Sequence, residues 1–194
     1  LLSFYLDTAF LRYYYKEKSI SNKHIQALFS THYWFLLLWG VTISLILTPI
    51  SQRLFGELVG IPIWPIVAAI LTALLGQLTL MVLGVWKANL EAKKVAIITT
   101  LAGLSSIALS LIMLIPFQMG WQSRIYATAI ISIIQAIAIT YIALKNHWLR
   151  FSFDIKIIKR SLLYALPLVP NIAAGWIAGF SDRLILTYYG KLED

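Results

Sequence analysis

Residues 63–86 read IWPIVAAILTALLGQLTLMVLGVW, and this stretch of 24 residues contains no charged side chain. A helix rises about 1.5 Å per residue, so this stretch can cross a hydrocarbon core about 30 Å thick. Three further stretches of similar length also lack Asp, Glu, Lys and Arg, namely 33–50, 95–115 and 125–144. The sequence therefore predicts an all-α, polytopic transmembrane bundle with at least four spans.

The composition of the chain supports this class. Of the 194 residues 60% are hydrophobic and only 12% are charged, whereas a soluble domain carries about a quarter charged residues. There is no cysteine, so disulfides and thiolate chemistry are excluded. The chain opens on the apolar run Leu1–Leu6 and stops at Glu193–Asp194, and we interpret it as an internal fragment of a longer protein.

The basic residues alternate between connectors. Twelve Lys and Arg side chains lie in 12–23, 87–94 and 145–160, whereas the other connectors hold only Arg53 and Arg124. Short loops with such an excess face the cytoplasm. This bias accounts for the net charge of +8 without a nucleic acid, so no nucleic-acid partner is predicted.

The basic linker 145–160 leaves two interpretations open. Ile155, Ile158 and Leu162 recur at helical spacing between Lys156, Lys159 and Arg160, which is typical of a helix at the headgroup boundary. A solvated basic loop is the other interpretation.

No catalytic constellation is visible. His24, His32 and His147 all fall in the predicted cytoplasmic flanks, and no nucleophile–base pair, metal-ligand cluster or phosphate-binding glycine loop occurs. The chain is therefore predicted not to be an enzyme, and neither a metal nor a cofactor is expected.

Uncharged polar side chains within apolar segments are the first candidate site residues, because a lipid-facing amide is costly. We expect each of these amides to face another helix or a watery cavity, namely Gln77, Gln135 and Asn171. Interhelical hydrogen bonding and a substrate path both remain open for them. Asp182 and Arg183 come about 20 residues after Ser161, where charges are expensive unless they are used. A functional pair and an outer-interface position remain open for them.

Two groups of residues resemble a known family. The run LPLVPN at 166–171, then Gly175-Trp176 and SDRLIL at 181–186, resembles the seventh span of bacterial polysaccharide flippases. These are the O-antigen, or Wzx-type, members of the multidrug/oligosaccharidyl-lipid/polysaccharide exporter superfamily. Asp7-Thr8-Ala9 and RYYY at 12–15 resemble the cytoplasmic end of their second span.

The resemblance implies a two-lobe bundle of twelve to fourteen helices in the bacterial cytoplasmic (inner) membrane, of which this chain holds the end of span two through span seven. Residues 1–144 would belong to the N-terminal lobe, 145–160 to a cytoplasmic inter-lobe linker and 161–194 to the first span of the C-terminal lobe. The implied activity is transport of undecaprenyl-diphosphate-linked oligosaccharide, coupled to H⁺ or Na⁺. Membrane lipids and other membrane proteins of polysaccharide assembly are the further expected partners.

The resemblance also implies roles for the candidate residues. Arg12 at the cytoplasmic end and Arg183 toward the outer end are candidates for holding the diphosphate, because a guanidinium fork suits phosphate oxygens. Asp182 would pair with a basic group elsewhere. Gln77, Gln135 and Asn171 would meet sugar hydroxyls.

Three alternatives remain open. A drug or cation antiporter of the same superfamily should carry acidic residues within its first-lobe spans, which the four apolar stretches lack. A lipid II or teichoic-acid-type flippase would differ mainly in the glycan. An O-antigen polymerase or ligase, an enzyme, should carry a large periplasmic loop, whereas the outer connectors 51–62 and 117–123 are short.

Overall fold

A computed structural model describes residues 6–17, 22–57, 60–171, 174–175, 177–179 and 181 of the chain. The described part is helical and contains no strand. Its elements are α1 (Leu6–Glu17), α2 (Asn22–Ser51), the π-helical η1 (Gln52–Glu57), α3 (Ile63–Ala88), α4 (Ala92–Leu114), α5 (Gln122–Lys145), α6 (Ile155–Ala165) and the 3₁₀ turn η2 (Leu166–Leu168).

Four of these helices are long and apolar enough to cross a membrane, which confirms that the four predicted apolar stretches form long helices. They cover Lys23–Leu54, Ile63–Ala88, Ala92–Leu114 and Gln122–Lys145. Within the described residues, the part of the predicted seventh span that follows Ser161 is divided between α6, η2 and a further helical turn. The predicted boundary between linker and second lobe, at residue 160, falls inside α6.

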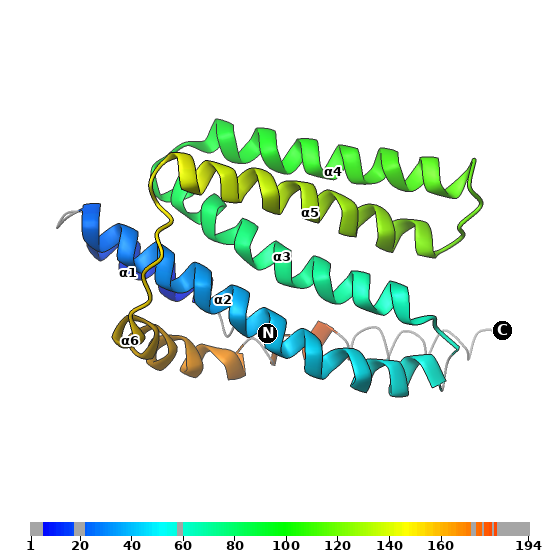
Figure 1. Cartoon of the computed structure of the whole chain (residues 1–194), viewed down its shortest axis with the longest axis horizontal. Coiled ribbons are helices and arrows are strands. Elements are labelled where there is room, and N and C mark those ends of the chain that lie inside the picture. The colour runs from blue at the N-terminus through cyan, green and yellow to red at the C-terminus, as the bar shows by residue number, and fades with distance from the viewer. Residues whose placement is uncertain are drawn as a thin grey trace.

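The four long helices form one bundle in which each helix runs antiparallel to the one before it in the chain (Figure 1). α3 packs against α2 on one side and α5 on the other, and α4 packs mainly on α5. The connectors 89–91 and 146–154 meet α1 and α6 at one end of the bundle, which we call the basic end. The basic connectors that alternate along the sequence therefore lie together at one end of the bundle.

Two sharp turns bring the chain around at the basic end. After α3, the amide of Glu91 donates to the carbonyl of Trp86 at 2.9 Å, and Leu90 adopts φ +59°. After α5, the amide of Trp148 donates to the carbonyl of Ala143 at 2.9 Å, and His147 adopts φ +55°. Both are Schellman caps with a non-glycine residue in the left-handed position.

The packed core lies toward the basic end. Phe10 of α1 packs edge-on to Phe29 and His32 of α2, and Phe29 also contacts Trp148. Further core residues come from α3 and α5, including Met81, Val82, Val85, Trp86, Ile139 and Ala143. By contrast, Ser106 is the buried residue of α4, as suits a helix whose other faces meet lipid or further helices.

Two boundaries differ from those predicted. A connector was expected to start at Arg12 and the next span at Tyr33, but α1 runs on to Glu17 and α2 begins at Asn22. The reason is that residues 12–32 are amphipathic: Tyr14, Leu28 and Phe29 face the core, whereas Lys16, Lys23 and His24 are exposed. Burial raises the pKa of the Tyr14 phenol, whose hydroxyl donates to Asn89 Oδ1 at 3.3 Å.

Candidate functional site

An open depression between α1 and α6 gathers basic side chains at the basic end of the bundle. Its lining residues, which we call the cationic groove, are Arg12 and Tyr13 of α1 with Lys156, Lys159, Arg160, Leu163 and Tyr164 of α6. Arg12 is thus the one sequence-predicted site residue that lies here. The four cations come from two helices about 145 positions apart in the chain, and only folding brings them together.

Aromatic rings hold the two guanidinium groups of the cationic groove. Arg12 Cζ lies 4.1 Å from the centroid of the Tyr164 ring, and Arg160 Cζ lies 4.1 Å from that of Tyr13. The two tyrosine rings meet edge to face at 6.4 Å. A cation over an aromatic face gains about 0.5–2 kcal/mol, so this interlocked arrangement joins α1 to α6 and orients both arginines.

One carboxylate compensates part of this charge. Glu17, which is 8% exposed, forms an ion pair with Arg160. Within the ranges that the structure describes, no acidic side chain forms an ion pair with Arg12, Lys156 or Lys159. The cationic groove therefore keeps an excess of positive charge that is open to an anionic ligand.

The local sequence explains how α6 presents these side chains. Asp154 caps the helix by accepting a hydrogen bond from the amide of Lys156 at 2.8 Å, a favourable N-terminal arrangement. Ile158, Ser161 and Ala165 are buried at helical spacing, so the basic residues fall on the remaining faces. The helical interpretation of the linker is thus confirmed for 155–165, although Ile155 is 72% exposed.

The rest of the linker, residues 146–154, is an extended strap held along α2. Ser30 Oγ accepts from the amide of Arg150 at 2.7 Å and donates to the carbonyl of Trp148 at 3.2 Å. Trp34 Nε1 donates to the carbonyl of Arg150 at 2.9 Å, and its ring stacks on Phe151 at 4.9 Å. This stretch is non-helical and mostly exposed, as the loop interpretation expected, but its backbone is held by Ser30 and Trp34. Sequence reasoning also missed Ser30 and Trp34, whose partners lie more than 110 residues away.

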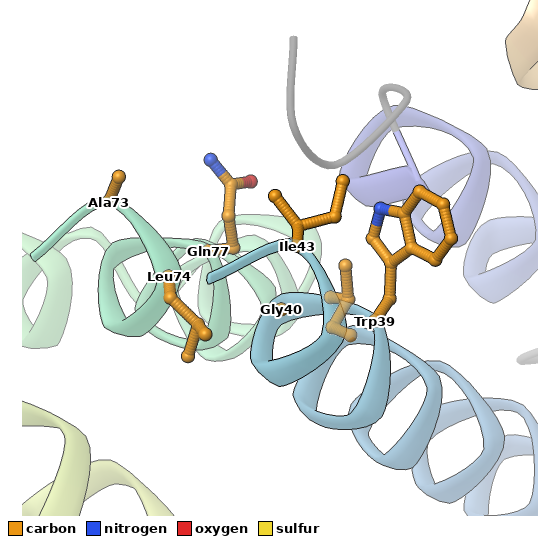
Figure 2. A pocket seen from close by; sticks show the side chains of 7 residues that line it. Trp39, Gly40, Ile43, Ala73, Leu74 and Gln77 are labelled. Carbon is orange, nitrogen blue, oxygen red and sulfur yellow. The ribbon is translucent and has the colours of Figure 1, made fainter. Parts of the chain in front are cut away.

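Gln77 lies in a small pocket between α2 and α3. Leu36, Trp39, Gly40 and Ile43 line it from α2, and Ala73, Leu74 and Gln77 line it from α3. Figure 2 shows the Gln77 amide on the side of the pocket toward which Ile43 and Trp39 also project. The pocket is almost entirely apolar apart from this amide.

Gln135 lies in a different groove, between α4 and α5. Its neighbours there are apolar apart from Ser105, and they include Ile98, Leu101, Ala102, Ile131, Ile134 and Ala138. The structure therefore does not bring Gln77, Gln135 and Arg12 into one site. Each of them lies in a separate helix–helix groove.

The remaining candidates lie late in the chain. Asn171 is exposed on the helical turn that contains Pro170. Asp182 and Arg183 lie outside the described residues, so their predicted roles stay predictions.

The histidines and carboxylates do not gather into a site in the part of the chain that the structure describes, where no group of three could hold a metal ion. His32 was expected in a polar flank but lies fully buried in the core. Its Nδ1 lies 2.8 Å from the carbonyl oxygen of Leu28, and Nε2 has no hydrogen-bond partner among the described residues.

Comparison of the chain with protein-family models, with curated proteins and with solved structures finds no match. The described part of the chain is thus all-helical, with four helices long and apolar enough to span a membrane and a cationic groove at one end.

Proposed function

We propose that this chain is part of a flippase that moves undecaprenyl-diphosphate-linked oligosaccharide across the bacterial cytoplasmic membrane for surface polysaccharide synthesis. The observation that carries the proposal is the kind of polar group found between the spans. The α2/α3 pocket and the α4/α5 groove each contain one uncharged amide, Gln77 or Gln135, and no acidic side chain.

This polarity suits a sugar better than a cation. Amides donate and accept hydrogen bonds, as sugar hydroxyls do, and they cost less to bury than charges. An antiporter for cationic drugs needs acidic groups in the membrane to hold its substrate, and the apolar stretches of all four spans lack them. The observation therefore favours the glycan over the cation as cargo.

The proposed transport is an alternating movement of two lobes that carries the glycan between leaflets while the prenyl tail stays in lipid. A gradient of H⁺ or Na⁺ would drive it. Asn171, Asp182 and Arg183 would line the path from the second lobe. In this proposal the basic end faces the cytoplasm, where the lipid-linked substrate is made.

Deletion of the gene in its host tests the proposal. We expect lipid-linked oligosaccharide of unaltered mass to accumulate with its glycan facing the cytoplasm, and surface polysaccharide to fall, both restored by the intact gene. Mass spectrometry gives the glycan, and accessibility to an impermeant glycosidase gives its side.

Two other outcomes would contradict the proposal. Repeat units that reach the outer leaflet but remain unpolymerised or unattached would indicate a polymerase or ligase. Altered sensitivity to cationic drugs with normal polysaccharide would indicate a drug antiporter.

A further inference from the structure

The cationic groove carries more positive charge than the contacts between α1 and α6 require. Of its four cations, Arg160 pairs with Glu17 and packs on Tyr13, and Arg12 packs on Tyr164. Both arginines therefore help to join α1 to α6. Lys156 and Lys159 are exposed and contribute nothing comparable to this interface, although like charges close together repel one another.

We infer that the cationic groove binds the diphosphate of a lipid diphosphate at the cytoplasmic membrane surface, before transport begins. The identity of that lipid rests on the proposed function. Two stacked guanidinium groups and two ammonium groups face one open depression. Charge-assisted hydrogen bonds to phosphate oxygens are about twice as strong as neutral ones.

The stacking on tyrosine explains why the arginines can serve as receptors. A ring against one face of a guanidinium leaves the N–H groups at its edge free to donate in plane. Arg12 and Arg160 are held in this way at 4.1 Å by Tyr164 and Tyr13, and Nη2 of Arg160 already donates to Glu17. Their side chains are thus partly ordered before a ligand arrives, which lowers the entropic cost of binding.

The apolar rim of the cationic groove indicates a lipid and not a soluble anion. Leu163 is one of its lining residues and is 65% exposed, and Leu166 on the next turn is 49% exposed. α6 thus presents apolar and basic side chains together, as helices at the headgroup boundary do. A lipid diphosphate offers both a polyanion for the cations and a tail for the exposed leucines.

Binding of a fluorescent prenyl diphosphate to the full-length protein in phosphatidylcholine nanodiscs tests the inference. The double variant Lys156→Gln/Lys159→Gln is the main test, because both side chains are exposed and neither supports the core. We expect its affinity to fall about tenfold. The matched control Lys87→Gln/Lys93→Gln removes two exposed charges at the same end of the bundle, outside the cationic groove, and should change affinity less than twofold.

Four results would overturn the inference. An equal loss in the control would mean that only the general surface potential acts. Full competition by inorganic pyrophosphate would indicate a soluble anion, and equal competition by phosphatidylglycerol would indicate any anionic lipid. Tight binding that depends on the cationic groove, without transport, would support this inference and contradict the proposed flippase. Transport by the protein, with unchanged binding in the lysine variant, would support the proposed flippase and contradict this inference.

Discussion

At the scale of the residue, Gly40 sets how closely α2 and α3 approach each other. A Cβ atom built at Gly40 would lie 2.5 Å from Cγ and Cδ1 of Leu74, closer than any side chain tolerates without movement. Leu74 therefore occupies the space that a side chain at position 40 would need (Figure 2). Small residues at such contacts let membrane helices pack tightly, since apolar burial contributes little between helices in lipid.

Gly40→Val should therefore lower the free energy of unfolding by about 1–3 kcal/mol through overpacking. Gly103→Val is the matched control, because a Cβ at Gly103 meets nothing within 4 Å. The measurement is thermal unfolding in detergent micelles, followed by circular dichroism. Gly40→Val/Leu74→Ala should recover part of the loss. Equal destabilisation by the two valine variants would show that the contact with Leu74 is not what matters.

At the scale of the element, the strap 146–154 joins the transmembrane bundle to α6. Its backbone is bound by side chains of α2 instead of by a partner strand, with Ser30 as the central group. Thr31 Oγ1 adds a hydrogen bond by accepting from the amide of Asp154 at 3.2 Å. The strap therefore fixes where α6, and with it the cationic groove, lies relative to α2.

Ser30→Ala should loosen the strap. It leaves the amide of Arg150 and the carbonyl of Trp148 without their side-chain partner, at a cost of about 1–3 kcal/mol. Amide exchange of the peptide covering 148–154 should then accelerate about tenfold or more, which hydrogen–deuterium exchange mass spectrometry measures.

Thr42→Ala is the control for this experiment, because the Thr42 hydroxyl donates only to the carbonyl of Leu38 in its own helix, at 2.9 Å. Unchanged exchange in Ser30→Ala, or equal acceleration in Thr42→Ala, would show that the strap does not depend on this contact.

Helical spacing in the linker indicated a helix but left a solvated loop open. The structure has a helix at 155–165, with Ile158 and Leu162 on its inner side and Ile155 exposed. The strap could not be predicted in the same way. Its hydrogen bonds join residues about 120 positions apart, and Ser30 has no local feature that distinguishes it from other serines at a helix surface. Periodicity predicts elements, whereas contacts between elements depend on the tertiary fold.

At the scale of the whole molecule, the sequence predicted the four spans well, since length and lack of charge decide whether a helix can cross a bilayer. Gln77, Gln135 and Arg12 were candidates for a substrate path, with interhelical hydrogen bonding left open for the two amides. They lie in three separate grooves, and their roles stay predictions. Depth along a span can be read from sequence, but the direction in which a side chain points around the helix depends on which neighbours pack there. The stacking of Arg12 on Tyr164 of α6 could not be predicted for that reason.

The central claim is that the protein moves a lipid-linked glycan without altering it, and reconstituted vesicles test this most directly. Full-length protein and labelled undecaprenyl-diphosphate-linked oligosaccharide are placed in liposomes with an imposed H⁺ or Na⁺ gradient, and an impermeant glycosidase reports the glycan exposed outside. We predict that glycan initially protected inside becomes accessible at a rate that depends on protein and gradient, with its mass unchanged. Labelled phosphatidylcholine in the same vesicles should stay on its own side. Glycan that remains protected, in vesicles holding folded protein in both orientations, would contradict the account.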